Sequence, residues 1–241
     1  MLRLFSIFFI AFALLLPHSS FAQDEIVVTG TRIDNSIPGI FLEKRGDFLL
    51  LEASIENDSR ELSTRLKEIN ATLEKFKEAA EKNPKITLGI VDDSDFVRPL
   101  SESNFSDSIS YGSRPDTSVA TLKVKTEIPE NVIDSYKLAQ MLGEFVDSIE
   151  EEDRTTITTY DEISVSVVNP FQYRVQVIKK VVDEVNMVTD GLGAEYRAII
   201  TGIDKELEWV RSGDLSLAFY LPYEYEIIPD TLHSIQRVIE D

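Results

Sequence analysis

Apolar and polar residues alternate between positions 163 and 168. The segment reads ISVSVV, which puts three aliphatic side chains on one face of a predicted strand and leaves the other face mostly to water. Asn169 follows and offers a side-chain oxygen to a first helical turn, and Pro170 suits that turn because its missing N–H costs nothing there. We therefore expect a helix to begin at Asn169-Pro170.

The residues after Pro170 continue with helical spacing. Apolar residues recur at steps of three and four along one stripe, which we expect to pack on a sheet: Phe171, Val175, Ile178, Val182 and Val185. Lys179, Lys180, Asp183 and Glu184 fall off this stripe and should face water. Gly191-Leu192-Gly193 is expected to end the helix, since a glycine there can adopt a left-handed conformation. Residues 196–203 then read as a strand.

An earlier strand-helix-strand unit has the same layout. Residues 48–55 are nearly all apolar, as in a strand covered on both faces. Asp58 and Glu61 resemble a capping box, and helical spacing follows through Leu62, Leu66, Ile69, Leu73, Phe76 and Ala80. Asn83-Pro84 should end this helix before a strand at 86–91. Two such units would organise the chain.

The intervening and flanking segments are less regular. Residues 26–29 are expected to form a first strand, residues 34–46 a loop, and residues 92–117 a long polar connection with an irregular hairpin near 105–111. Ala120, Leu122 and Val124 alternate with Thr121, Lys123 and Lys125, which predicts a half-buried strand.

The last third contains two more predicted elements. Pro129-Glu130 is expected to open a helix that runs to Ile149 and is followed by a solvated acidic loop, Glu150 to Asp153. Residues 215–228 should form a final strand or hairpin, and residues 229–241 a tail or short helix.

These elements predict an α+β fold with helices packed on a mainly antiparallel sheet. The expected organisation is a signal peptide at 1–22, an N-terminal strand and loop at 23–46, a main domain at 47–228 with an insertion at 92–117, and the tail at 229–241.

The first 22 residues have the layout of a secretory signal peptide. Arg3 precedes an apolar run from Leu4 to Leu16, and Ser20 and Ala22 are the small residues before a cut ahead of Gln23. The apolar run is shorter than the about 20 residues that a spanning helix needs, so an uncleaved anchor is the lesser alternative.

Composition indicates a cellular location and argues against one class of function. The chain of 241 residues carries a formal net charge of −19, which repels phosphate backbones and argues against nucleic-acid binding. It has no cysteine, so an exported form has no disulfides and must be stabilised by its hydrophobic core. Export without disulfides is more typical of a bacterial periplasmic protein than of a small secreted eukaryotic protein.

Candidate chemistry is sparse, and we assign no catalytic, cofactor-binding or metal-binding residue. After signal removal His233 is the single histidine, which disfavours a Ser-His-Asp arrangement and a zinc site. The carboxylates of Asp92 to Asp95 could bind calcium, but they lack the spacing of an EF-hand loop, and a solvated turn is the simpler interpretation. The same holds for the acids at 150–153.

Two further segments allow a structural and a functional interpretation. The run EIVVTGTR from Glu25 to Arg32 resembles the mature N-terminus of TonB-dependent outer-membrane receptors, but the rest of the chain is too short and too helical for a receptor barrel. An energy-coupling role for this segment is left as a minor alternative. The aromatic segment with Phe219, Tyr220, Tyr223 and Tyr225, together with Trp209, is either core or an edge that pairs with another subunit.

The order of these motifs is similar to that of the SIMPL-domain family. The resemblance rests on IVVTG at 26–30, DFLLLEASIEND at 47–58 with its helix, and ISVSVVNP at 163–170 with YRVQVIKKVVDEV and the Gly-Leu-Gly break. That family includes periplasmic proteins linked to oxidative-stress defence and a ring-forming antigen of the outer membrane. The resemblance implies export, an α+β fold and self-association, and it brings no catalytic residues.

Two function hypotheses follow. The first is an exported, non-enzymatic SIMPL-like envelope protein of the periplasm or outer membrane, without a membrane span after signal cleavage, that self-associates or binds envelope partners. The alternative is an exported carboxylate-based hydrolase or a calcium-dependent binding protein that uses Asp92 to Asp95.

Overall fold

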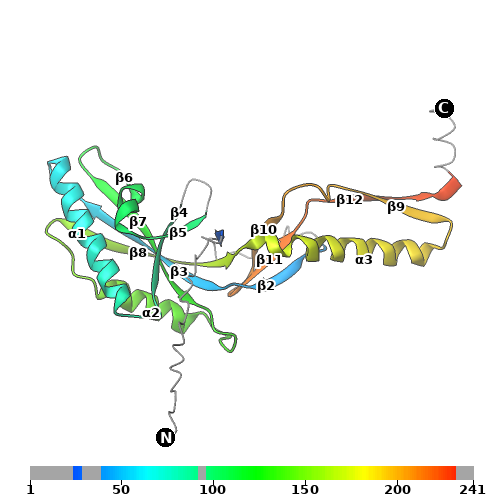
Figure 1. The fold of residues 1–241 in the computed structure, drawn as a ribbon, viewed down its shortest axis with the longest axis horizontal. Helices are drawn as coiled ribbons and strands as arrows, with labels where there is room; N and C mark the ends of the chain where they lie inside the picture. The colour runs from blue at the N-terminus through cyan, green and yellow to red at the C-terminus, as the bar shows by residue number, and fades with distance from the viewer. Residues whose placement is uncertain (1–23, 29–38, 92–95, 232–241) are drawn as a thin grey trace, which may run out of the picture.

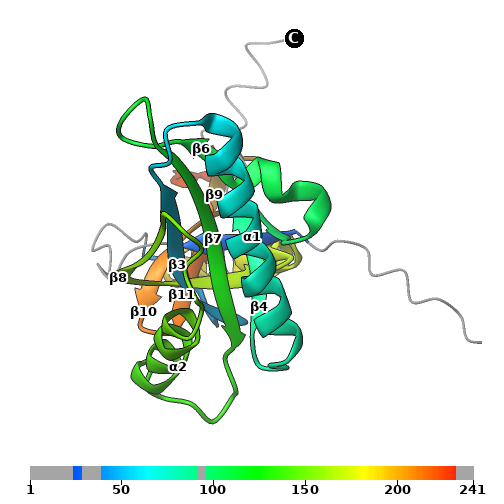
Figure 2. The ribbon, with the colours of Figure 1, turned by 90° about the vertical axis from the view of Figure 1, so that its left-hand side faces the viewer.

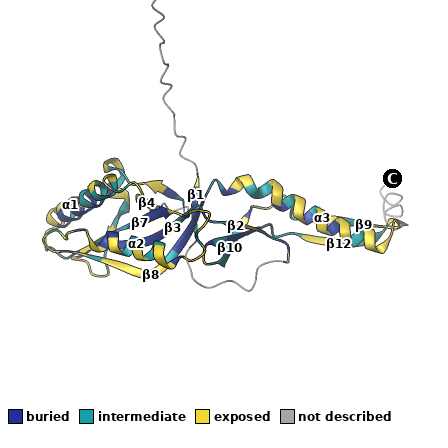
Figure 3. Ribbon diagram, turned by 90° about the horizontal axis from the view of Figure 1, so that it is seen from below, coloured by how far each residue is buried: buried dark blue, intermediate teal, exposed yellow. Residues whose placement is uncertain are grey.

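The computed structural model describes residues 24–28, 39–91 and 96–231, and it arranges them in an elongated molecule (Figure 1). The body, at one end, consists of the largest sheet with helices α1 (Leu62–Glu81) and α2 (Tyr136–Asp147). The arm, at the other end, consists of helix α3 (Arg174–Leu192) with strands β9 (Tyr196–Thr201) and β12 (Glu224–Pro229). Buried residues concentrate in the body, and the arm is exposed over much of its surface (Figure 3).

The body is built on one antiparallel sheet. Its strands lie in the order β1 (Glu25–Val28), β8 (Thr155–Val168), β3 (Phe48–Asn57), β7 (Ser118–Glu127), β4 (Thr87–Val91) and β5 (Val97–Pro99). A short strand, β6 (Ile109–Tyr111), pairs with the first residues of β7. The expected α+β class with a mainly antiparallel sheet is confirmed.

Two strand-helix-strand units interleave in this sheet. Strands β3 and β4 both run antiparallel to β7, so they are parallel to each other, and α1 connects them. Strands β7 and β8 both run antiparallel to β3 and are connected by α2. The result is a double split β-α-β arrangement of the ferredoxin-like type.

Both body helices cover the same face of the sheet (Figure 2). Phe76 of α1 and Phe145 of α2 meet with ring centroids 6.3 Å apart, and both pack in one core with the helix-facing side chains of β3 and β7. These side chains are the alternate residues of the two strands: Leu49, Leu51, Ala53, Ile55, Ala120, Leu122 and Val124. The apolar periodicity of α1 and β7 therefore predicted core residues such as Ile69, Leu73 and Phe76 correctly, but Leu62, the first residue of the predicted α1 stripe, is 47% exposed.

The proposed capping box of α1 is wrong. The helix begins after Glu61 without a side-chain cap, because the Asp58 carboxylate accepts a hydrogen bond from Arg154 instead. The helix ends at Glu81, just before Asn83-Pro84, as expected.

The unit predicted at 163–203 is not a second copy within the sheet. After β8 the chain leaves the body through a short 3-10 turn, η2 (Pro170–Tyr173), and enters α3. Strand β9 then pairs with β12 and not with β8, so the two form a separate two-stranded antiparallel sheet that packs against α3. The helix that returns to the sheet is α2.

The start of α3 also differs from the prediction. Asn169 makes no capping hydrogen bond and has a left-handed backbone with a φ of 50°, while its N–H donates to the carbonyl of Asp24 beside β1. This contact extends the β1–β8 pairing to the end of β8, so the helix proper begins only at Arg174. The end is as predicted, with Gly193 at a φ of 104° just after Leu192.

A second sheet lies between the body and the arm (Figure 1). It has the strand order β10 (Glu208–Gly213), β11 (Ser216–Tyr220) and β2 (Leu42–Arg45). Residues 34–46 were expected to be a loop, but β2 at their end is a strand. Residues 215–228 do not form one hairpin either, because β11 and β12 belong to different sheets.

Two more boundaries were misplaced. The segment 92–117 contributes β5, the 3-10 helix η1 (Glu102–Ser108) and β6, so most of its described part is ordered against the body. Helix α2 begins at Tyr136 and not at Pro129, because the Arg45 guanidinium donates to the carbonyls of Pro129 and Val132 and holds this segment in turns.

The tail and the signal segment lie outside the described residues, apart from the first residues after Pro229. In the described part of the chain, helices of the length and apolar character needed to cross a bilayer are absent.

Candidate functional site

The face of the main sheet opposite the helices is partly enclosed. Strand β1 pairs with β8 at one edge, and its residue Ile26 also forms a β-bridge with Phe96, just before β5 at the other edge. The two edges therefore approach each other, and the sheet curls around this face.

Burial of β8 on both sides follows from this curl. Ser164 and Ser166, which were expected to face water, are almost fully buried. On this side of the strand the Glu25 side chain of β1, the neighbouring strand, reaches over and accepts from Ser166, so both faces of β8 are covered here. Short hydroxyl side chains leave room for that carboxylate.

A buried ion pair fastens β1 across the sheet. The carboxylate of Glu25 accepts from Lys125 of β7 and, at 2.6 Å, from the hydroxyl of Ser166. The Lys125 ammonium also lies 4.3 Å from the centroid of the Phe48 ring. Because an isolated buried charge is costly, each of these groups depends on its partners.

A second ion pair lies two residues along β7. The ammonium of Lys123 is 2.5 Å from a carboxylate oxygen of Glu52, its direct neighbour across the β3–β7 pairing. The Lys123 side chain is 8% exposed and that of Glu52 is 31% exposed, so the carboxylate reaches toward solvent.

A cleft of about 390 Å³ opens above this second pair. Its floor is formed by β3 and β7, and its walls by β1, the end of β4, the end of η1, and β6. The lining side chains are mostly polar: Val27, Glu52, Val91, Asp107, Ser108, Ser110, Thr121 and Lys123. A cleft of this volume is within the range of small-molecule sites.

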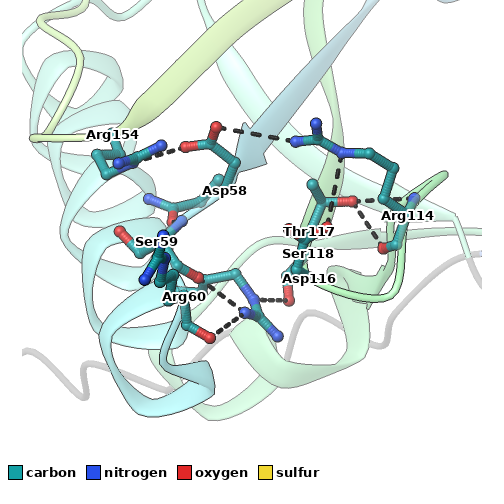
Figure 4. A network of polar contacts seen from close by, with 10 residues as sticks. Asp58, Ser59, Arg60, Arg114, Asp116, Thr117, Ser118 and Arg154 are labelled. Atoms are coloured by element: carbon teal, nitrogen blue, oxygen red, sulfur yellow. Dashed lines mark hydrogen bonds and ion pairs between the residues drawn. The ribbon is translucent and has the colours of Figure 1, made fainter.

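A polar network closes the far end of the sheet, where β3 meets the start of α1 (Figure 4). Arg154 and Arg114 lie on opposite sides of Asp58, with nitrogen–oxygen distances of 2.7 and 3.8 Å (Figure 4). The hydrogen bond from Arg154 is the main reason why the pKa of Asp58 lies below its ordinary value.

The buried part of this network is fully paired. Arg65 donates to the carbonyl of Ser59 at 2.8 Å and to the hydroxyl of Ser118 at 3.1 Å. Glu68 accepts from the Asn57 amide at 2.6 Å and from the Ser59 hydroxyl at 2.9 Å. These two hydrogen bonds, that from Asn57 above all, lower the pKa of Glu68. We interpret the network as a structural clamp.

The arm presents the other distinctive surface. Seven of the twelve exposed large hydrophobic side chains of the described part of the protein belong to it or to η2 beside it: Phe171, Val175, Met187, Leu192, Tyr196, Ile199 and Tyr225. An apolar surface on a thin, extended element is typical of a surface that meets another molecule.

Helix α3 carries two apolar stripes on different faces. Val177, Val181 and Val185 are buried, the last two against Ala198 and Ile200 of β9. The stripe predicted from the sequence lies on a different face, and its first residues, Phe171 and Val175, are 47% and 74% exposed. The predicted phase of the buried face was therefore wrong except at Val185.

The sequence candidates fall in three places. Asp92 to Asp95 and His233 lie outside the described residues. The acids at 150–153 form an exposed turn in which Glu152 pairs with Lys75 at 2.6 Å. Within the described ranges, groups of three or more side chains suited to a metal ion are not found.

The aromatic segment near the C-terminus is divided. Phe219 is fully buried and contacts the rings of Trp209 and Tyr173, so it belongs to the core. Tyr223 and Tyr225 stack on each other in the arm with centroids 6.4 Å apart. Pairing of this segment with another subunit stays a prediction.

Sequence reasoning missed the two buried lysines. It placed Lys123 and Lys125 on the wet side of a half-buried strand, which is the usual interpretation of alternating charge. The available signal was the acid at the matching inward position of two other strands, Glu52 and Glu25. Using that signal requires knowing which strands are neighbours.

Comparison with known protein families, with curated proteins and with solved structures finds no match to this chain. What the structure defines is thus an α+β protein with a ferredoxin-like body, a polar cleft and an exposed arm.

Proposed function

We propose that this chain is an exported, non-enzymatic envelope protein of the SIMPL type that self-associates through its arm. Export is supported by the signal-like segment at residues 1–22, and the family by the motif order described above. The observation that carries self-association is the second apolar stripe of α3, in which Phe171 and Val175 are 47% and 74% exposed.

The stripe has the spacing of a helix-docking surface. Phe171, Val175, Ile178 and Val182 follow each other at steps of four, three and four, and the latter two are partly buried. The buried face of the helix is already used by β9, which leaves Phe171 and Val175 accessible to a partner. Burying it against a partner would remove apolar area from water.

Charge favours a second copy of this chain as the partner. Lys179 and Lys180 precede Asp183 and Glu184 by one helical turn, and in the described residues none of the four forms an ion pair. Two α3 helices packed antiparallel along the stripe about a two-fold axis would bring Lys179 of one, the charge nearest to the stripe, toward Asp183 of the other. Lys180 and Glu184 lie on the opposite side of the helix and take no part in this contact. Such an isologous contact is the commonest kind in homo-oligomers.

Sedimentation velocity of the chain from Gln23 onward tests the proposal. We expect a concentration-dependent oligomer that Val175→Glu disrupts, because the new carboxylate lies within the apolar contact. Gln176→Glu is the matched control: it adds the same charge at the next position, on an exposed side of α3 away from the stripe. A chain that is monomeric up to about 100 μM, well above the micromolar range of weak specific contacts, would contradict self-association.

The control also separates the helix face from net charge. Equal weakening by both variants would attribute association to general repulsion rather than to the stripe. If the oligomer persists in Val175→Glu, a different surface must join the copies.

A further inference from the structure

The cleft above Lys123 has an unfilled hydrogen-bonding requirement. An ammonium has three N–H donors, and buried polar groups in folded proteins are normally satisfied. In the described part of the chain Lys123 donates to Glu52 only, although its side chain is almost entirely removed from bulk solvent. Its remaining donors are available to a molecule in the cleft.

The other polar groups of the lining offer mainly acceptors. The hydroxyl protons of Ser108 and Ser110 are directed to backbone carbonyls of Phe105 and Val119, which leaves their oxygens as acceptors. Glu52 has carboxylate lone pairs beyond those used by Lys123, and the Asp107 carboxylate is about half exposed at the rim. Thr121, beside Lys123 on β7, is the hydroxyl that remains free to donate.

Among the lining residues that the structure describes, the charges are balanced in pairs. Lys123 faces Glu52, and Asp107 lies 3.9 Å from Arg98. A simple anion would gain one ammonium but meet two carboxylates, and a simple cation would leave the spare donors of Lys123 unmet. A molecule that carries both charges satisfies both sets of groups. The described residues of the lining include no aromatic ring on which a flat apolar ligand could stack.

We propose that this cleft binds a small zwitterion of amino-acid type. Its carboxylate accepts from Lys123 and from the hydroxyl of Thr121. Its ammonium donates to Glu52 and Asp107, with the oxygens of Ser108 and Ser110 taking the hydroxyl or amide protons of a polar side chain. Val27 and Val91 cover its carbon atoms.

The Glu25–Lys125 pair fixes the frame of this site. It holds β1, and with it Val27, over the sheet next to the cleft. Lys125 itself is used up by Glu25 and the Phe48 ring, which explains why the binding role falls to Lys123 and not to its neighbour on the same face.

Isothermal titration calorimetry of the chain from Gln23 onward tests the assignment with four probes. L-Serine and L-glutamine carry both charges, hydroxypropanoate lacks the amino group of serine, and ethanolamine lacks its carboxylate. We expect saturable binding of at least one amino acid at or below about 10 mM, a generous limit for weak binding, and no saturation with the two single-charge probes.

Two variants locate the binding site. Lys123→Met removes the ammonium and should abolish binding. Since it also leaves Glu52 without its partner, Thr121→Val is the milder test: it keeps shape, removes one donor and should weaken binding about fivefold to tenfold. Thr158→Val, an exposed threonine of β8 outside the lining, is the matched control and should bind like the unchanged protein.

Three results would overturn the proposal. The first is no saturable binding of either amino acid. The second is hydroxypropanoate or ethanolamine binding as tightly as serine, which would assign a site for a single charge. The third is unchanged affinity in Thr121→Val together with a folded Lys123→Met that still binds.

Discussion

The ion pair between Glu25 and Lys125 gives the sharpest quantitative prediction. Both residues are less than a tenth exposed, so replacing one leaves the other charged and buried without its partner. Loss of one member of such a pair typically costs about 3–5 kcal/mol. We therefore expect Lys125→Met and Glu25→Leu each to lower the free energy of unfolding by about that amount.

The double variant should cost less than either single one. With both charges removed, the Ser166 hydroxyl is the group left without a hydrogen-bond partner, because its acceptor Glu25 is gone. This loss costs about 1–3 kcal/mol of stability. Methionine and leucine also fill much of the volume of the original side chains. The coupling energy of the double-mutant cycle is then about 3 kcal/mol or more, larger than contacts of exposed ion pairs provide.

Urea unfolding followed by circular dichroism measures these free energies. Because β1 has only four residues, it can also detach before the body unfolds, which would limit the apparent cost. Hydrogen exchange at backbone amides that donate to the β1 segment, such as that of Asn169 at the end of β8, which donates to the Asp24 carbonyl, distinguishes the two routes. In the single variants these amides should exchange faster than those of β3.

A cycle in which the two single costs are below about 1 kcal/mol and simply add would refute the reasoning. It would mean that both groups are hydrated and that β1 is not fastened by charge. Unchanged exchange in β8 in the single variants would lead to the same conclusion.

The remaining two predictions concern two buried charged side chains, Glu68 of α1 and Arg211 of β10. Since hydrogen bonds lower the pKa of Glu68 below its ordinary 4.5, it stabilises the protein above that pH and the contribution is lost as pH falls through the lowered pKa. The Tm of Glu68→Gln should therefore lie furthest below that of the unchanged protein near neutral pH, and the two Tm values should converge in acid. Glu78→Gln, on the exposed side of the same helix, is the control, and its difference in Tm should show no such convergence. Arg211 of β10 is buried and donates to the carbonyls of Ile163 and Asp214, both at 2.6 Å, so it ties the second sheet to β8. Arg211→Met should cost about 3 kcal/mol, or about 6–12 °C in Tm by calorimetry, and an unchanged Tm would show that these carbonyls find other donors.

Several elements could be predicted from local sequence because local spacing was enough to specify them. The helical spacing of α1, the continuous apolar run of β3 and the alternation in β7 identified the core residues Phe76, Leu49 and Leu122. Breaks at Pro84 and Gly193 located the ends of two helices within a few residues. In each case the signal and the structure involve residues close together in the chain.

The second strand-helix-strand unit was misassigned because propensity and pairing disagree there. Residues 163–203 do contain a strand, a helix and a strand, as expected, but no local feature states that β9 pairs with β12 and not with β8. In α3, two apolar stripes compete, and only the position of β9 decides that Val177 and Val181 are buried while Val175 is exposed.

Sequence alone thus determined the longer helices and strands, the α+β class, and the large negative charge. The tertiary structure decided what each face meets: serines of β8 became buried, Lys123 and Lys125 turned inward, and a cleft arose between segments up to about a hundred positions apart. The physical reason is that periodicity records which side chains can be covered, whereas strand order and sheet curvature, set by contacts distant in the chain, determine what covers them.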